Sequence, residues 1–167
     1  MIIQPSAVSI IQSSFEQIKP NAGRFTRVFY DRLFERDPSL KKLFIRDIRE
    51  QRKKFFRMLG SIVKNLSNPD ELEPKLQDLG SRHDYYSVKR EDYRTFFEAF
   101  IYTLAAALGN DFDENTRHAW RDFCDYVGAH MCKEIRAERE EIMEQIRAQA
   151  EAATAVSAES SSEETVS

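Results

Sequence analysis

The sequence predicts an all-α domain with about seven helices, and three observations support this prediction. Apolar residues recur at spacings of three and four along most of the chain, which is the spacing of one helix face. Glycine and proline occur only five times each, too rarely for a turn-rich all-β fold. The 167 residues suffice for one domain with a sizeable core, and no internal repeat divides them.

The N-terminal half contains four candidate helices separated by turn signals. Pro20 opens the second of them, and Asp37-Pro38 separates it from a short helix that ends near Phe44. A longer helix starts near Ile48 and ends at Ser67-Asn68-Pro69. The apolar faces of the three longer helices are Val8, Ile11, Phe15 and Ile18; Phe25, Phe29 and Leu33 beside Tyr30 and Phe34; and Phe55, Leu59, Ile62 and Leu66, preceded by Gln51.

The C-terminal half contains three further candidate helices. The first carries Leu72, Leu76, Leu79 and His83 on one face, at spacings of four, three and four. The second follows a turn at residues 86–88 and ends at Gly109-Asn110. The last begins near Glu114 and is expected to continue through residue 153. The apolar face of the second of these helices consists of Tyr93, Phe97, Phe100, Leu104 and Leu108. The apolar face of the last helix consists of Trp120, Phe123, Val127, Met131 and Ile135.

We divide the chain into a domain at residues 1–137, a C-terminal helical extension at 138–153, and a disordered acidic, serine-rich tail at 154–167. Residues 133–167 carry nine acidic and four basic side chains, whereas residues 1–132 carry 19 acidic and 21 basic side chains. The net charge of −3 gives no indication of nucleic-acid binding. No apolar run approaches the ~20 residues of a membrane span, and no export signal is visible, so we expect a cytoplasmic protein with free thiols.

Three histidines are candidates for a metal ligand, and His83 is the strongest because it lies on an apolar helix face. Taken alone, such a histidine is more often a core residue with a satisfied ring than a ligand. A neutral imidazole is nevertheless a good donor to iron. His118 and His130 lie in stretches that look solvated, and neither has a second ligand at the spacing of a zinc site.

Two polar residues interrupt the apolar faces of the N-terminal helices. Gln51 lies one turn before Phe55, which is compatible with a boundary glutamine or with a group that points into a pocket. Tyr30 lies in a helix that buries a broad surface, where its hydroxyl needs a partner. Each residue alone is more often structural than functional.

Taken together and in order, these residues resemble the globin family, especially bacterial single-domain globins and the globin domains of flavohaemoglobins. The resemblance covers about residues 6–135 and is carried by four segments: FYDRLFERDPSLKKLF, QRKKFFRMLG, LQDLGSRHDYYSV and HAWRDF. It implies a globin-like fold with seven to eight helices around a haem pocket, here with an extended last helix. It also implies haem b, with its iron, as the cofactor.

The resemblance assigns a role to each matching residue. His83 matches the proximal iron ligand, while Tyr30 and Gln51 match the distal residues that face the bound gas. Phe44 matches the phenylalanine stacked on the haem, and Lys54 is placed to reach a propionate. The other positions that match the lining of the haem pocket are Phe55, Leu79, Val88, Tyr93 and Phe97.

The sequence departs from flavohaemoglobins in two respects. Its five glycines form no dinucleotide-binding fingerprint, so the reductase of those proteins has no counterpart here. The last-helix glutamate that lies near the proximal histidine in those proteins falls on Ile135, and Glu134 is one residue away from that position. One residue on a helix corresponds to a rotation of about 100°. A proximal network for O₂ activation is therefore not expected.

Four hypotheses follow. The first is a non-catalytic protein that binds O₂ reversibly at ferrous iron, with Tyr and Gln donors that stabilise the negatively charged ligand and with NO or CO as further ligands. The second is an NO dioxygenase served by a separate reductase. The third is a haem-based gas sensor or interaction protein that uses the C-terminal helix, which is also a candidate for oligomerisation. The last is a haem-free helical bundle.

Overall fold

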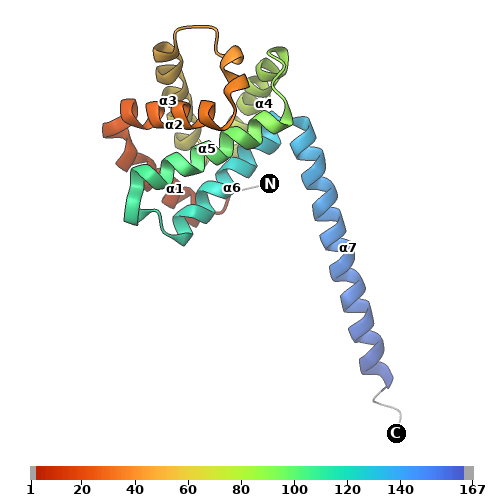
Figure 1. Cartoon of the computed structure of the whole chain (residues 1–167). Coiled ribbons are helices and arrows are strands. Elements are labelled where there is room, and N and C mark those ends of the chain that lie inside the picture. Colours follow the sequence, from red (N-terminus) through yellow and green to blue (C-terminus); the bar gives the residue numbers. More distant parts are fainter. Residues whose placement is uncertain (1–2, 164–167) are drawn as a thin grey trace.

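The computed structural model describes the backbone of residues 3–163 and the side chains of residues 3–154. The described backbone forms seven α-helices and three short 3-10 helices (Figure 1). The α-helices are α1 (Pro5–Ile18), α2 (Ala22–Arg36), α3 (Ile48–Lys64), α4 (Pro69–Tyr85), α5 (Arg90–Leu108), α6 (Glu114–Met131) and α7 (Lys133–Glu163); the 3-10 helices are η1 (Lys19–Asn21), η2 (Pro38–Leu43) and η3 (Gly109–Asp111).

The helix starts follow from local sequence signals. Asp113 caps α6 because its Oδ1 accepts a hydrogen bond of 2.8 Å from the backbone N–H of Thr116. Asp47 caps α3 through a bond of 2.9 Å from the N–H of Arg49. Pro5 and Pro69 occupy the first turns of α1 and α4, where a missing N–H costs no helical hydrogen bond.

The core forms between helices that are distant in the sequence and pack in pairs. The most extensive helix pairs are α2 with α5, α1 with α6, and α4 with α6. The indole N–H of Trp120 donates a hydrogen bond of 2.9 Å to the Ser14 hydroxyl and so joins α6 to α1. The largest fully buried side chains include Trp120, Tyr30, Phe29 and Phe100. The sequence prediction of an all-α globin-like fold is confirmed.

Helices α4 and α6 approach so closely at Gly80 that a side chain would not fit between them. A Cβ atom added to Gly80 would lie 2.2 Å from the backbone oxygen of Met131 and 2.7 Å from its Cα. Because both contacts are to backbone atoms, neither can move aside without shifting a helix. The glycine therefore sets the position of the second half of α4, which carries His83 three residues later.

The predicted last helix is divided in two at Cys132. This residue has extended backbone angles, φ −120° and ψ 118°, so that α6 ends at Met131 and α7 starts in a new direction. The break keeps Ile135 packed against the core, while the rest of α7 projects away from the bundle (Figure 1). The helical backbone is described to Glu163; the tail predicted at 154–167 stays a prediction, and residues 164–167 lie outside the described part.

No helix among the described residues is long and apolar enough to span a membrane.

Candidate functional site

Tyr30 and Gln51 meet in the interior between α2 and α3. Tyr30 is 1% exposed. The side-chain amide of Gln51 donates a hydrogen bond of 3.3 Å to the Tyr30 hydroxyl oxygen. Because the oxygen accepts this bond, the phenolic hydrogen remains available to donate to another group.

The hydroxyl of Tyr30 stays protonated well above neutral pH. Burial raises its pKa to about 12, and the hydrogen bond from Gln51 and the positive charge of Arg52 oppose this shift. Tyr30 is therefore a neutral hydrogen-bond donor throughout the physiological range.

Aromatic rings from α2, α3 and η2 surround this pair. Phe44, which ends η2, packs edge-on against Tyr30 with ring centroids 5.4 Å apart. Phe55 lies one turn after Gln51 and stacks on Phe29 at 4.8 Å. Phe44 and Phe55 are only partly buried, so both present ring surface outside the packed core.

On α4, His83 has one ring nitrogen fixed and the other free. Nδ1 lies 2.8 Å from the backbone oxygen of Leu79. A carbonyl oxygen only accepts, so Nδ1 carries the hydrogen and Nε2 keeps its lone pair. Within the described part of the chain, no protein group is bonded to Nε2.

The other two histidines differ from His83 at Nε2. In His118 this atom lies 3.1 Å from a carboxylate oxygen of Glu114, and in His130 it lies 3.3 Å from one of Glu73. The side chain of His130 is only 13% exposed, so it is more buried than its sequence context indicated. Of the three histidines, His83 alone has an Nε2 without a partner among the described residues.

Helix α5 links the His83 side to the Tyr30 side through a continuous series of aromatic contacts. The series begins on α3, where the ring of Phe55 lies 5.6 Å from that of Phe96 on α5, measured between centroids. Along α5, the centroids are 5.8 Å apart for Phe96 and Phe97 and 6.4 Å apart for Phe97 and Tyr93. The ring of Tyr93 then lies 6.0 Å from that of His83 on α4. The structure therefore brings the predicted residues of the two sides onto one apolar wall.

The buried face of α4 is turned slightly from the one predicted. Leu72, Leu76 and Gly80 point into the core, whereas Leu79 and His83 are only partly buried. Val88 is also half-buried, and its N–H bonds the His83 carbonyl oxygen at 3.1 Å. Ser87 makes this tight corner possible with a left-handed backbone angle, φ 60°.

These features fit a flat apolar cofactor held by one nitrogen ligand. The partly buried side chains Phe44, Phe55, Leu79, Val88 and Phe97 would lose water-exposed surface against such a group. His83 would supply the ligand atom through its free Nε2, and Tyr30 would supply a polar group near the bound ligand. Lys54 is exposed on α3, where its flexible side chain can reach an acidic edge of the cofactor.

Among the predicted site residues, Tyr93 has a buried polar group without a partner in the described part of the chain. Its hydroxyl is buried and makes no hydrogen bond with any described residue. Burial raises the pKa of this hydroxyl, and the nearby Cys132, Asp84 and Glu134 add to the shift when they are ionised. Glu134 accepts a hydrogen bond of 3.2 Å from Cys132 Sγ and not one from Tyr93.

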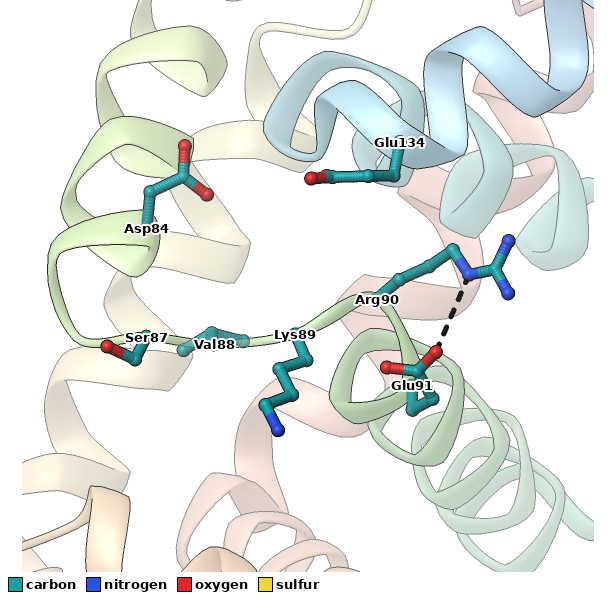
Figure 2. A pocket seen from close by; sticks show the side chains of 7 residues that line it. All are labelled: Asp84, Ser87, Val88, Lys89, Arg90, Glu91 and Glu134. Atoms are coloured by element: carbon teal, nitrogen blue, oxygen red, sulfur yellow. Dashed lines mark ion pairs between the residues drawn. The ribbon is translucent and has the colours of Figure 1, made fainter.

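A polar hollow of about 430 Å³ lies beside this region, between the α4–α5 corner and the start of α7. Figure 2 shows the carboxylates of Asp84 and Glu134 pointing toward it from opposite sides. Its lining is Asp84, Ser87, Val88, Lys89, Arg90, Glu91 and Glu134. Only Val88 belongs to the predicted site, and the charged lining is unsuited to an apolar cofactor.

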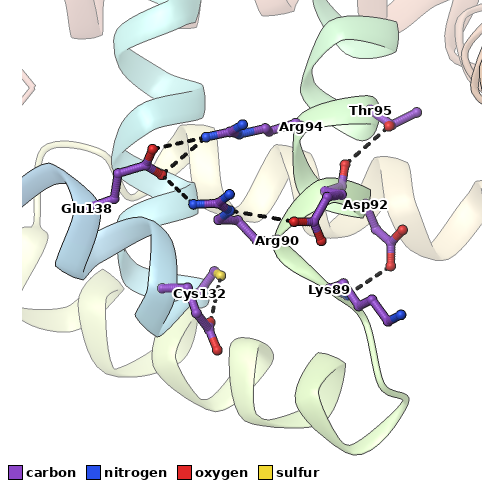
Figure 3. Close-up of polar contacts among 9 residues, drawn as sticks. Lys89, Arg90, Asp92, Arg94, Thr95, Cys132 and Glu138 are labelled. Atoms are coloured by element: carbon purple, nitrogen blue, oxygen red, sulfur yellow. Dashed lines mark hydrogen bonds and ion pairs between the residues drawn. The ribbon is translucent and has the colours of Figure 1, made fainter.

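The same corner is connected to α7 by ion pairs (Figure 3). Glu138 on α7 binds Arg90 and Arg94 on α5, with N–O distances of 3.1 Å to each. All three side chains are partly exposed, so water and salt weaken these pairs.

The sequence analysis missed the positioning role of Gly80. The signal was available, because Gly80 follows Leu76 by four residues and so lies on the same helix face. A glycine on a buried helix face indicates the close approach of another helix.

Comparisons with known proteins agree with this arrangement. A family model described as Globin matches residues 27–131. Neuroglobin from Tetraodon nigroviridis is 25% identical over 138 residues, which covers 74% of this chain and 87% of the relative. Neuroglobin from Chaenocephalus aceratus is 26% identical over 136 residues, with 73% and 86% covered. Neuroglobin from Danio rerio is 26% identical over 138 residues, with 74% and 87% covered.

Proposed function

The chain belongs to the globin family, and from this premise we propose that it is a haem protein that binds O₂ reversibly, with His83 as the iron ligand. Membership of the family implies haem binding, and haem b is the form we propose. The observation that carries the proposal is the state of the three histidines: His83 alone has a free Nε2, on the apolar wall that continues to Tyr30.

The proposed role of His83 depends on its bond to Leu79. The hydrogen bond from Nδ1 to the backbone oxygen fixes the ring tautomer and its orientation, and it makes Nε2 a stronger donor. Haem would supply the ferrous iron that takes up O₂. The proposed contacts of the haem faces are Phe44, Phe55, Leu79, Val88, Tyr93 and Phe97, with Lys54 at a propionate.

On the opposite side, Tyr30 is the proposed hydrogen-bond donor to the ligand. Gln51 donates to the Tyr30 oxygen, and this bond directs the phenolic hydrogen away from Gln51. A donor to a partly negative O₂ stabilises it more than it stabilises CO, which carries less charge. We therefore propose that Gln51 acts mainly by orienting Tyr30, whereas the sequence analysis expected both side chains to donate to the ligand.

The pair of Tyr30 and Gln51 supports the proposal of a subtype close to bacterial single-domain globins. The second candidate function, NO dioxygenation with a separate reductase, has less support on the proximal side. Glu134 bonds Cys132, and the Tyr93 hydroxyl has no carboxylate partner among the described residues. NO and CO remain proposed alternative ligands.

A specific observation favours a third candidate, a gas sensor that transmits its state through α7. Glu138 connects α7 to the start of α5, directly after the corner that holds Val88 near His83. The exposed Ile142, Met143 and Ile146 on α7 would then contact a partner or a second copy. Oligomerisation through this helix remains part of this proposal.

The test is to add hemin to the purified protein, reduce it anaerobically, and record absorption spectra before and after O₂ and CO. We expect one hemin per chain and spectral changes that reverse when each gas is removed. A protein that takes up no hemin would contradict the haem proposal. Hemin uptake without a reversible O₂ spectrum would contradict the proposal of O₂ binding but not the proposal of haem binding. Rapid NO consumption with turnover in the presence of a reductase would favour the enzyme.

A further inference from the structure

The outer surface of α3 and the segment before it are strongly basic. Residues 41–64 carry nine Lys and Arg side chains and two acidic ones, a net charge of +7. The rest of the chain carries 16 basic and 26 acidic side chains, a net charge of −10. The protein is therefore strongly dipolar even though its net charge is only −3.

Most of these positive charges are free to interact with a partner. Eight of the nine basic side chains are exposed, and Arg52 is half-buried. Arg49 pairs with Asp47, Lys53 with Glu50, and Arg52 with Asp31. The basic side chains without an ion pair among the described residues are Lys41, Lys42, Arg46, Lys54, Arg57 and Lys64.

The exposed positive charges of α3 share one side of the helix. At about 100° per residue, Arg49, Lys53, Arg57 and Lys64 lie within about 80° of one another on the side opposite Gln51. Ile45, which is 88% exposed and precedes Arg46, adds an apolar side chain just before the helix. Exposed apolar groups near charged side chains are typical of protein interaction surfaces. We call Arg49, Lys53, Arg57 and Lys64 together the basic face.

The basic face lies directly behind the proposed ligand pocket. The inner side of α3 carries Gln51 and Phe55, and its outer side carries Lys53 and Arg57. A helix with its side chains is about 10 Å across. A protein bound to the outer side would therefore be separated from the pocket by this one helix.

We propose that the basic face docks an acidic protein that donates single electrons, and this inference rests on the proposed function. Reversible O₂ binding requires ferrous iron, and the sequence contains no dinucleotide-binding fingerprint of its own. In the proposed electron transfer, a reduced flavin in the partner loses one electron and ferric haem iron gains it. No chemical group is transferred. Opposite charges accelerate such encounters, and redox partners form small, transient interfaces.

The negative charge of the remaining surface favours a compact protein as the partner over an extended polyanion such as nucleic acid. Nucleic acid or an anionic membrane would also meet the acidic remainder of the molecule, with its net charge of −10. Aromatic side chains for stacking on bases are not exposed on the basic face; the exposed tyrosines are Tyr85, Tyr86 and Tyr102, on or next to α4 and α5. A compact acidic protein can contact the basic face alone.

The test uses two charge-reversal variants with the same change in net charge. Arg57→Glu with Lys64→Glu alters the basic face at exposed residues that have no ion pair among the described residues. Lys75→Glu with Arg121→Glu is the matched control, at exposed positions on α4 and α6. The probe is an acidic flavodoxin. Binding of the oxidised flavodoxin to the haem-free chain is measured by calorimetry. Reduction of the hemin-loaded ferric chain by the reduced flavodoxin is measured by stopped flow.

We expect the basic-face variant to weaken binding and slow reduction at least tenfold at low salt, and the control to change each less than about twofold. Raising the salt should slow the wild type toward the variant. Equal effects of the two variants, or no flavodoxin binding by the wild type, would overturn the proposal. Basic-face-dependent binding of duplex DNA or phosphatidylserine vesicles without flavodoxin binding would also overturn it. Because binding is measured on the haem-free chain, failure of haem binding would be recognised separately.

Discussion

The two sides of the proposed haem pocket differ in how many of their polar atoms have a partner within the chain. On the distal side, Tyr30 is fully buried and its hydroxyl already accepts a hydrogen bond from Gln51. On the proximal side, His83 is half-buried with a free Nε2, and the nearby Tyr93 hydroxyl is buried without a partner. The distal side is preorganised by the chain itself, whereas the proximal side lacks a ligand for its nitrogen.

This difference indicates what each side contributes. On the proximal side, the proposed bond from His83 Nε2 to the iron is the one specific attachment of the cofactor to the chain, whereas on the distal side Tyr30 would contact only the bound gas. Changes on the proximal side should therefore affect retention of the cofactor. Changes on the distal side should affect which gas is held and for how long.

The largest expected effect is that of His83→Ala on the retention of haem. Without the imidazole, no histidine remains on the apolar wall to bind the iron, and haem loss to excess apomyoglobin should accelerate more than about 100-fold. His118→Ala is the matched control, because its ring is exposed and bonded to Glu114. Unchanged retention and an unchanged ferrous spectrum in His83→Ala would show that another group binds the iron.

The next effect is that of Tyr30→Phe on the release of O₂. The substitution keeps the ring but removes a donor worth about 1.5–3 kcal/mol, so O₂ dissociation should accelerate about 10- to 150-fold. CO dissociation should change much less. Stopped-flow release of both gases measures this, and equal changes would mean that the shape of the pocket controls the ligand.

Gln51→Leu should have a smaller effect, about two- to tenfold on O₂ release, because it removes a neutral bond that orients Tyr30. In the double variant with Tyr30→Phe, the release rate should match that of Tyr30→Phe alone. Additive effects of the two substitutions would instead indicate two independent donors to the ligand.

The pH dependence of O₂ release should be smaller still. Burial raises the pKa of Tyr30 to about 12, so its donor form persists from neutral pH to about pH 11. Release should be constant over this range and accelerate only as Tyr30 ionises. The same shift stabilises the fold by at most about 2.7 kcal/mol below pH 10, an effect lost as pH rises from 10 to 12. Acceleration near pH 10 would mean that Tyr30 is not buried as described.

Truncation after Ala137 should have the smallest effect on the pocket. It removes most of α7 and the pairs of Glu138 with Arg90 and Arg94, which are partly exposed and worth about 0–1 kcal/mol. Haem binding should remain intact. A lower sedimentation mass after truncation would support self-association through α7, while loss of haem would contradict the domain boundary at residue 137.

Helical spacing and turn signals were sufficient to predict the fold, because α1 to α6 each have an apolar face that is bounded by turn signals. The break at Cys132 was not predictable, since residues 127–142 continue one apolar spacing through it. Its cause is tertiary: α6 must end at the contact of Met131 with Gly80, and α7 then turns to keep Ile135 on the core.

The sequence could nominate the candidate site residues but not their hydrogen bonds. The spacing that placed His83 on an apolar face could not show that its Nδ1 bonds the Leu79 oxygen. The direction of the Gln51–Tyr30 bond also depends on how α2 and α3 pack. Likewise, the sequence showed that His130 was close to Tyr126 but not that Glu73 from α4 would occupy its Nε2.

The most direct test of the central claim, that His83 Nε2 is the iron ligand, is imidazole rescue of His83→Gly. The substitution leaves space for a free imidazole at the position of the lost ring. We expect the reduced, hemin-loaded variant to regain the wild-type ferrous spectrum and O₂ binding when imidazole is added, in proportion to site occupancy. A wild-type spectrum in His83→Gly without imidazole, or no response to imidazole at any concentration, would contradict the assignment.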